Sequence, residues 1–240
     1  RFMENEILDD LQNGYFIFQP DGGFKFGMDA VLLADFAAVR ARRAIDLCTG
    51  TGIIPTLLAA KTETARIDAV EIQHDMADMA KRSVAYNGLE DRINIIEGDL
   101  KDAPQMLGKG CYDVVTVNPP YMKHGGGIIN DGDMKAVSRH EIKCTLEDVI
   151  RVSSELLIPH GKLFIVHRPS RLADLFCEMR RFSVEPKLMR PVHPYPGKEM
   201  NLVLVSGIKN ARPELKILPP LYVYNNDGSY TKEIDEIYGR

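Results

Sequence analysis

The sequence predicts an α/β protein with a doubly wound sheet that is mostly parallel and covered by helices on both faces. Along its 240 residues, short β-branched apolar runs alternate with longer segments of helical period, which is the pattern of a parallel sheet with crossover helices. The last two strand-like runs, 188–192 and 202–206, leave no room for a crossover helix, so they must pair antiparallel. Apolar residues make up 45% of the chain and charged residues 27%, as in globular proteins with a sizeable core.

Seven short apolar runs are the expected strands. They cover residues 44–48, 67–72, 93–96, 114–117, 163–166, 188–192 and 202–206. The helices between them are expected at residues 53–61, 75–86, 145–158 and 170–181. Asp75 and Thr145 are expected to cap the second and third helices, because a side-chain oxygen can accept from the free N–H groups of a first turn. Asn87-Gly88 gives the second helix a left-handed stop, and residues 159–161 are expected to end the third.

The chain is expected to form a single domain. No repeat or linker divides residues 25–208, so the domain spans 1–240, with an N-terminal extension of about 1–25 and a C-terminal tail of about 209–240 packing on it. The extension alternates aromatic residues, and the tail carries Asn226-Asp227-Gly228, which is typical of a hairpin turn. Each end is expected to be a lid or an edge cover.

The cysteines and the absence of long apolar runs indicate a cytoplasmic protein without a metal. The cysteines stand at least 33 residues apart, without the spacing of a zinc site or a redox motif. They are expected to be reduced core thiols: Cys48, Cys111, Cys144 and Cys177. No apolar run approaches the ~20 residues needed to cross a bilayer, and the start does not resemble a signal peptide.

Charge is unevenly distributed along the chain. The net charge of −4 argues mildly against a polyanionic partner. Residues 135–198, however, hold 12 Lys or Arg against 7 Asp or Glu, a local charge of +5. This stretch is either a basic face or a solvated surface with scattered charges.

A glycine-rich turn follows the first strand of the expected sheet. Asp46 lies on that strand, and Gly50 and Gly52 precede the helix, where glycine lets a ligand approach the backbone and the helix offers free N–H groups. Glu71 ends the next strand, where a carboxylate can accept from the two hydroxyls of a ribose. Together they predict a site for a nucleoside-containing cofactor. An NAD site fits nearly as well, although Pro55 stands where a dinucleotide fold needs a third glycine; a tight turn with a surface glutamate is the structural alternative.

Acidic and amide side chains end the third and fourth strands. Since ligands bind outside the carboxyl ends of parallel strands, Asp46, Glu71, Asp99 and Asn118 are expected to converge on one crevice. Asp99 could accept from an adenine amino group while the N–H of Leu100 meets a ring nitrogen. The alternative for Asp99 is a helix cap.

The most informative residues are Asn118-Pro119-Pro120-Tyr121. Two prolines fix φ and remove two N–H donors, which leaves carbonyl acceptors exposed at the end of the strand. The Asn118 side-chain oxygen and the Pro119 carbonyl could then accept from one planar NH2 group, and Tyr121 gives a face on which a flat base or amide can stack. The alternative is that these four residues form a turn without a role in ligand binding.

These motifs, in this order, resemble the class I S-adenosylmethionine-dependent methyltransferases of the Asn-Pro-Pro-Tyr amino-methylating group. The similarity runs throughout the chain, which resembles the bacterial tRNA1(Val) adenine-37 N6-methyltransferase group. It rests on residues 24–36, 46–52, 71, 99, 118–121, 139–141, 167–169 and 219–239. The resemblance implies a Rossmann-like sheet of seven strands, with the last two antiparallel. It also implies S-adenosylmethionine near Gly50, Gly52, Glu71 and Asp99, and the target amine at Asn118. Cys48-Thr49, where many relatives carry a glycine, is a departure.

The expected reaction is methylation of the N6 amine of an adenine in a tRNA loop. Two acceptors that hold both hydrogens would move the amine nitrogen toward tetrahedral geometry and free its lone pair for in-line attack. The adenine must be splayed out, with Tyr121 as its stacking platform. The basic stretch would contact phosphates, with Arg168 and Arg171 as candidate substrate-binding residues. A monomer or a weak oligomer is expected.

Four alternatives stay open from sequence alone. A protein glutamine methyltransferase uses the same amide chemistry without needing a basic face. A DNA adenine methyltransferase would act on the same kind of amine. An NAD-dependent oxidoreductase would give Asn118 no role. A non-catalytic RNA-binding protein would have no reason to keep the cofactor and amine positions.

Overall fold

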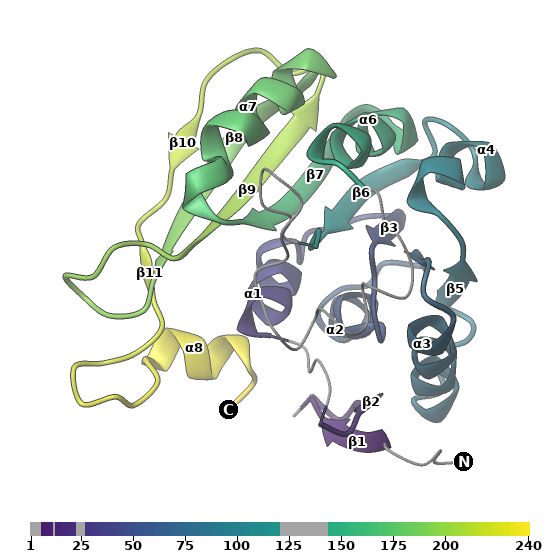
Figure 1. Cartoon of the computed structure of the whole chain (residues 1–240), viewed down its shortest axis with the longest axis horizontal. Coiled ribbons are helices and arrows are strands. Elements are labelled where there is room, and N and C mark those ends of the chain that lie inside the picture. The colour runs from purple at the N-terminus through teal and green to yellow at the C-terminus, as the bar shows by residue number, and fades with distance from the viewer. Residues whose placement is uncertain (1–5, 12, 23–26, 121–143) are drawn as a thin grey trace.

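The chain folds around one mixed sheet that has helices on both faces (Figure 1). The computed structural model describes residues 6–11, 13–22, 27–120 and 144–240. Within these ranges the sheet has nine strands in the order β10-β8-β9-β7-β6-β3-β4-β5, and β11 also pairs with β8. The strands are β3 (Arg43–Leu47), β4 (Arg66–Glu71), β5 (Ile93–Glu97), β6 (Tyr112–Val117), β7 (Leu157–His167), β8 (Val184–His193), β9 (Leu202–Lys209), β10 (Lys216–Ile217) and β11 (Leu221–Tyr222). The helices are α1 (Met28–Phe36), α2 (Ile53–Lys61), α3 (His74–Tyr86), α4 (Ala103–Leu107), α6 (Leu146–Leu156), α7 (Leu172–Arg181) and α8 (Lys232–Ile237).

The predicted mixed α/β fold is confirmed, with one refinement in strand direction. β3 to β7 are mutually parallel, and β9 is antiparallel to both β7 and β8. The last pair is therefore antiparallel as predicted, but β8 itself runs in the same direction as β7. The two-residue strands β10 and β11 extend the sheet beyond the expected seven strands, because two residues are too few to show a periodic pattern. The carboxyl ends of β3 to β8 consequently lie along one side of the sheet. We call this row of strand ends the carboxyl edge.

Two hydrophobic cores flank the sheet. The first includes Leu33 of α1, Leu57 of α2 and Ile234 of α8. The second includes Ile150 of α6 and Leu175 of α7. Burial on both faces explains why consecutive residues of the central strands, such as 44–47 of β3 and 114–117 of β6, are buried rather than alternately exposed. No helix in the described part of the chain is long and apolar enough to cross a bilayer.

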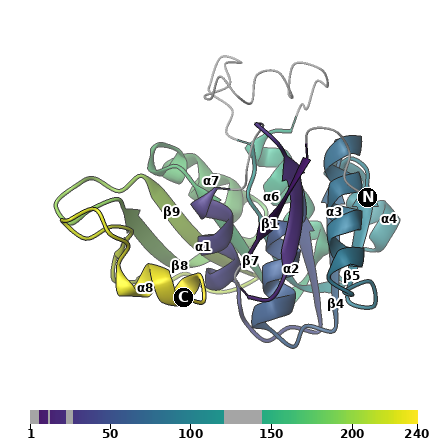
Figure 2. The same ribbon diagram turned by 90° about the horizontal axis from the view of Figure 1, so that it is seen from below.

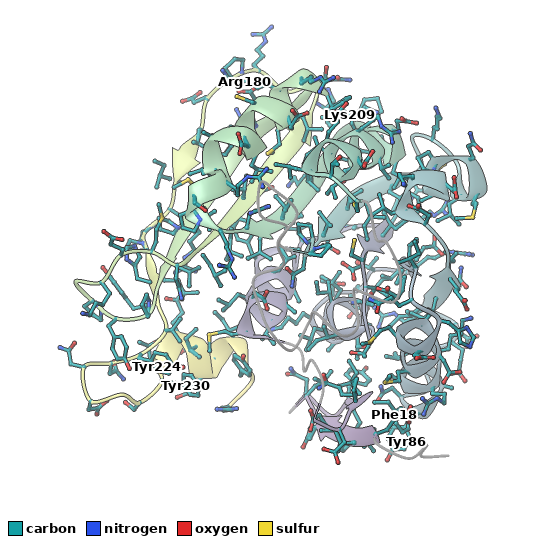
Figure 3. The ribbon with its side chains drawn as sticks, viewed as in Figure 1. Phe18, Tyr86, Arg180, Lys209, Tyr224 and Tyr230 are labelled. Carbon is teal, nitrogen blue, oxygen red and sulfur yellow. The ribbon has the colours of Figure 1, made fainter. Side chains whose placement is uncertain are left out.

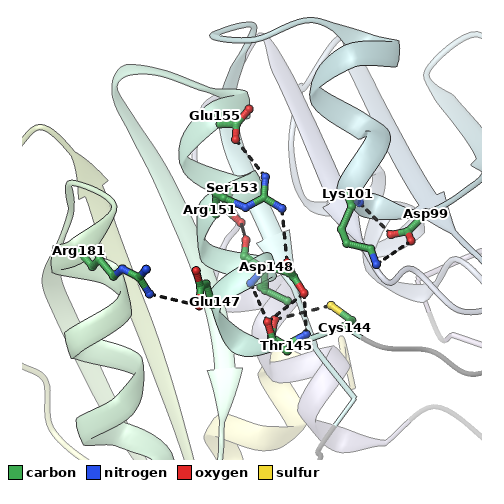
Figure 4. A network of polar contacts seen from close by, with 11 residues as sticks. Asp99, Lys101, Cys144, Thr145, Glu147, Asp148, Arg151, Ser153, Glu155 and Arg181 are labelled. Atoms are coloured by element: carbon green, nitrogen blue, oxygen red, sulfur yellow. Dashed lines mark hydrogen bonds and ion pairs between the residues drawn. The ribbon is translucent and has the colours of Figure 1, made fainter.

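Helix boundaries follow the local signals with two corrections. The Thr145 cap is confirmed: its hydroxyl accepts from Asp148 N at 3.1 Å, and the Asp148 carboxylate accepts from Thr145 N at 3.1 Å (Figure 4). Asp75 is not a cap, since α3 begins at His74. Residues 159–161 do not end a helix; β7 already begins at Leu157, because its pairing with β6 overrides the local stop signal.

The N-terminal segment forms a hairpin, β1 (Glu6–Asp10) with β2 (Phe16–Pro20), beside α3 (Figure 2). Phe16 N donates to Asn87 Oδ1 at 2.8 Å, and Asn87 Nδ2 donates to Phe16 O at 2.6 Å. Arg82 of α3 forms an ion pair with Glu6 at 2.6 Å. The hairpin therefore covers a helix rather than a sheet edge. The aromatic residues at 24 and 26 lie outside the described residues.

The C-terminal tail packs along β8 and against α1. β11 pairs in parallel with β8, α8 contacts α1, and Lys61 Nζ of α2 donates to Ile237 O at 2.8 Å. The expected hairpin is reduced to one antiparallel bridge between Tyr224 and Tyr230. The tail is thus an edge cover whose main pairing partner is β8.

The cysteines are free thiols, but they are less buried than expected. Cys177 is exposed, and the other three are half-buried. The prediction of core thiols is therefore wrong for Cys177, because its position on α7 faces solvent while Leu175 and Met179 of the same helix enter the core.

Candidate functional site

The structure brings the predicted cofactor residues together at the carboxyl edge. Asp46 lies near the end of β3, Glu71 ends β4, and Asp99 and Asn118 follow β5 and β6. These strands are adjacent in the sheet, so their ends form one continuous row. Tyr121 lies outside the described residues.

Glu71 holds the glycine turn in place. Its side chain is buried, and its carboxylate accepts from Gly50 N at 2.8 Å and from Gln73 N at 2.9 Å. Burial raises the pKa of Glu71, which the two backbone donors partly offset. Because a carboxylate has about four acceptor positions, these two bonds leave capacity for the hydroxyls of a ligand.

The two glycines of the turn have different roles. Gly50 has φ +58°, and a Cβ added there would meet nothing within 4 Å, so this side of the turn is open to a ligand. Gly52 has φ +86°, and a Cβ there would lie 3.2 Å from Ala80 Cβ of α3. Gly50 therefore permits close approach of a ligand, whereas Gly52 permits close packing of the turn on α3.

Asp46 is a buried carboxylate below this turn. Its side chain is 0% exposed; Oδ1 accepts from Thr116 Oγ1 at 2.6 Å. Asp46 Oδ2 and the buried Thr49 Oγ1 have no partner among the residues that the structure describes. Burial raises the pKa of Asp46 to about 7, although the Thr116 hydrogen bond opposes the rise. A buried acceptor without a partner suits a ligand that carries positive charge.

Asp99 has the capping role that the sequence left open. It accepts from Lys101 N at 2.9 Å at the start of a 3-10 turn (Leu100–Asp102) and forms an ion pair with Lys101 Nζ at 3.3 Å (Figure 4). The side chain of Leu100 is buried. The cap orients Asp99 at the carboxyl edge but does not by itself show a ligand contact.

Asn118 is oriented by a residue that sequence reasoning did not assign. Its Nδ2 donates to Asp29 Oδ2 at 3.2 Å, while Asp29 Oδ1 accepts from Ala30 N at 2.9 Å in the first turn of α1. Pro119 is buried and Pro120 is exposed. The available signal for Asp29 was an acid at the start of an apolar run, but its partner lies 89 residues away in the sequence.

A second unassigned residue is Ile72, directly after Glu71. It is 41% exposed, one of the few large apolar side chains in the described part of the chain with that much exposure. It therefore offers an apolar surface next to the glycine turn. An apolar residue following a strand-end acid was the only signal, and such a residue is common inside strands.

The predicted basic face is divided between two ends of the molecule. Arg168 and Arg171 follow β7 at the carboxyl edge, and Arg171 pairs with Asp174 at 2.7 Å. Arg180 and Arg181 end α7, which returns toward the opposite edge (Figure 3). Both are ion-paired, Arg180 with a carboxylate at 2.8 Å and Arg181 with two carboxylates at 3.2 and 3.3 Å. Residues 135–143 lie outside the described residues.

A buried histidine, His167, directly precedes Arg168. We call Arg168 and Arg171 the arginine pair. His167 ends β7, and burial together with the charges of Arg171 and Arg168 lowers its pKa to about 4. Its Nδ1 accepts from Arg168 N at 2.8 Å. His167 is therefore neutral at physiological pH and does not add to the positive charge there.

Comparison with known proteins identifies the family. Residues 26–174 match the family model of the methyltransferase small domain. The chain belongs to this family. That span contains the glycine turn, Glu71, Asp99, Asn118 and the arginine pair at the end of β7.

Two curated relatives of this methyltransferase share a name. A Porphyromonas gingivalis protein named tRNA1(Val) (adenine(37)-N6)-methyltransferase is 30% identical over 193 residues, which cover 78% of this chain and 75% of the relative. A Tolumonas auensis protein of the same name is 29% identical over 242 residues, covering 94% of each chain.

Solved structures have the same fold. A predicted O-methyltransferase of Agrobacterium tumefaciens is 28% identical, with a TM-score of 0.70 over 88% of this chain and 96% of the other. The Pyrococcus horikoshii TYW2 protein, solved in complex with MeSAdo, has a TM-score of 0.62 at 13% identity, over 88% and 74% of the two chains. The latter likeness shows the fold alone.

The methyl donor of this methyltransferase is S-adenosylmethionine, and the residues at the carboxyl edge fit that molecule. The open face at Gly50 admits a ligand, and the carboxylate of Glu71 has spare acceptor capacity. Asp46 Oδ2 has no hydrogen-bond partner among the described residues. S-adenosylmethionine carries ribose hydroxyls and cationic groups that match these features.

Proposed function

We propose that this methyltransferase methylates the N6 amine of an adenine in tRNA. The observation that carries the proposal is the hydrogen bond from the Asn118 amide to Asp29 at the end of β6, directly before two prolines. The names of the curated relatives point to the same reaction. The whole of residues 1–240 would act as one cytoplasmic methyltransferase domain, as a monomer or a weak oligomer.

The Asp29 contact orients the Asn118 amide for catalysis. An ionised carboxylate only accepts hydrogen bonds, so the amide must present its NH2 to Asp29. Its oxygen is then the atom left for the substrate. That oxygen and the Pro119 carbonyl would hold the two hydrogens of the target amine and stabilise the nitrogen as it becomes tetrahedral. When bound, S-adenosylmethionine supplies the electrophilic methyl group.

The remaining carboxyl-edge residues would hold the cofactor. Glu71 would accept from the ribose hydroxyls while it keeps Gly50 in place. Asp99 and the N–H of Leu100 would meet the adenine, and the exposed side chain of Ile72 would cover one of its faces. The cationic part of the cofactor would favour the ionised form of Asp46.

Substrate contacts are proposed at the same edge. Arg168 and Arg171 would contact phosphates near the target base, and Tyr121 remains the predicted stacking platform. Arg180 and Arg181 belong to the same basic stretch but are not proposed as substrate contacts, because α7 carries them away from the carboxyl edge.

The rival substrates are a protein glutamine and a DNA adenine, since either presents an NH2 group of similar chemistry. The family assignment favours methyl transfer over the oxidoreductase alternative. It also favours an enzyme over a non-catalytic RNA-binding protein. The proposed acceptor pair at Asn118 supports the same choice, because RNA binding alone would not need it.

The experiment that tests the proposal offers four substrates separately. Labelled S-adenosylmethionine is incubated with unmodified tRNA, a peptide-release factor, duplex DNA or free adenosine, and the labelled product is identified after digestion. We expect N6-methyladenosine from tRNA. Label on glutamine or on DNA, with none on tRNA, would overturn the proposal.

Variants at the β6 end test the mechanism. Asn118→Ala should reduce turnover about a hundredfold to a thousandfold, the usual effect of losing ~2.7 to 4 kcal/mol of transition-state hydrogen bonding, while cofactor binding persists. Asp29→Ala should reduce turnover roughly tenfold to a hundredfold, because the amide loses its orientation. Ser170→Ala, an exposed position at the same edge, is the control. Near wild-type turnover of folded, cofactor-bound Asn118→Ala would contradict the mechanism.

A further inference from the structure

Three tyrosines form a stack at the surface of the C-terminal tail. Tyr195 and Tyr224 have ring centroids 5.2 Å apart and an interplanar angle of 29°, and Tyr224 and Tyr230 are also 5.2 Å apart, at 18°. Tyr230 is 38% exposed. We call Tyr195, Tyr224 and Tyr230 the tyrosine ladder; two of its members are labelled in Figure 3. None of them is used by the reaction described above.

Backbone hydrogen bonds hold the ladder in a fixed arrangement. Tyr224 N donates to Pro194 O at 2.9 Å, which ties the tail to the loop that carries Tyr195. The turn between Tyr224 and Tyr230 is closed by Asn225 N donating to Ser229 O at 2.8 Å. The rings are therefore presented on a preorganised frame, which lowers the entropy cost of binding.

The fold places the ladder on the same edge as Asn118. β8 runs in the same direction as β7, so the loop after His193 leaves from the carboxyl edge. Three strand spacings separate β6 from β8, through β7 and β9. At about 4.8 Å per spacing this is roughly 14 Å. The loop after β8 and the tail meet where Tyr224 N donates to Pro194 O, and both lie on the left of Figures 1 and 2.

Charges of both signs lie near the rings. The Arg240 guanidinium lies 5.7 Å from the Tyr230 ring centroid and 5.1 Å from that of Tyr238. Lys198 is exposed on the loop that carries Tyr195. Glu199 on the same loop and Asp227 in the tail turn are exposed as well. At the Tyr195 end of the ladder, the described part of the chain places no further ring or guanidinium over the stack.

Flat aromatic faces fit an unpaired nucleobase, and the Arg240 guanidinium beside Tyr230 adds a second planar group. Unstacked bases in RNA loops are held on tyrosine faces and arginine planes, with little dependence on sequence. β8 is not available to pair with a peptide strand, because β10 and β11 already occupy its outer side. The chemistry therefore favours RNA.

We propose that the tyrosine ladder is a second contact surface for the substrate RNA, on which an unpaired base outside the methylated position stacks. This inference rests on the proposed tRNA substrate. The ladder positions the RNA relative to Asn118 and touches no reacting atom. It contributes affinity for RNAs that present an unpaired loop base in addition to the target adenine.

The test measures tRNA affinity with the full chain and S-adenosylhomocysteine present. Tyr195→Leu and Tyr230→Leu keep apolar bulk but lose the flat face, and Tyr195→Phe and Tyr230→Phe keep it. We expect the Leu variants to raise the Kd for unmodified tRNA about 5-fold to 150-fold, and the Phe variants to raise it less than twofold. Turnover at saturating tRNA and the Kd for S-adenosylhomocysteine should be unchanged.

The control is Tyr86→Leu, which removes a tyrosine that is 56% exposed on α3, away from the ladder (Figure 3). Its tRNA affinity should match wild type. Unchanged tRNA affinity in both Leu variants, or equal losses of affinity in the Leu and Phe variants, would overturn the proposed role of the ladder. The proposed tRNA reaction would be unaffected. A wild-type enzyme that neither binds nor methylates tRNA would instead overturn the proposed function, and the ladder with it.

Discussion

Asp46 should make the stability of the cofactor-free protein fall as pH rises. Its carboxyl is 0% exposed and has a pKa of about 7, raised by burial from an ordinary value of 3.8. Below pH 4 the group is protonated in both the folded and the unfolded chain and has no effect on stability. Between pH 4 and 7 the unfolded chain ionises and the folded chain does not, so unfolding becomes more favourable.

The size of the effect follows from the two pKa values. A difference of about three pKa units at 1.36 kcal/mol per unit gives roughly 4 kcal/mol of lost stability by pH 8. Asp46→Asn removes this dependence because an amide does not ionise. Any constant effect of the substitution, such as an altered hydrogen bond to Thr116, cancels when values at two pH values are subtracted.

The assay is urea unfolding of wild type and Asp46→Asn at several pH values from 4 to 8. The free energy of unfolding of the variant, relative to wild type, should increase by roughly 4 kcal/mol across that range. Thr116→Val should raise the pKa of folded Asp46, because it removes the hydrogen bond that stabilises the ionised carboxylate. The loss of stability should then continue to a higher pH than in wild type. A difference between wild type and Asp46→Asn that stays flat with pH would refute the argument.

Two further predictions concern binding. Glu71→Ala should weaken S-adenosylhomocysteine binding by ~1 to 3 kcal/mol in calorimetry, because the ribose hydroxyls and the Gly50 and Gln73 N–H groups lose their acceptor; unaltered affinity would remove Glu71 from the site. Charge reversal of the arginine pair that follows β7 should raise the Kd for tRNA and flatten its dependence on salt, whereas Arg180→Glu should not. Equal effects of the two changes would show that position on the fold does not matter.

Local sequence signals predicted most of the secondary structure and part of the site. The α2 bounds, 53–61, follow from the glycine turn and the apolar run, and the Thr145 cap follows from its spacing to Asp148. The strand ends that carry Glu71 and Asn118 were also predictable. These features depend on residues within a few positions of each other, so the chain itself displays them.

Contacts between distant segments were decided only by the tertiary structure. The Asp29–Asn118 hydrogen bond joins residues 89 positions apart. β7 begins at Leu157 because β6 offers it a pairing partner. The arginine-rich stretch is split because α7 runs from one edge of the sheet to the other, and the ladder forms because β11 lies beside β8. Each of these features depends on which elements become neighbours in the folded chain. Local periodicity does not show this, because such contacts stabilise the protein only after the sheet has assembled.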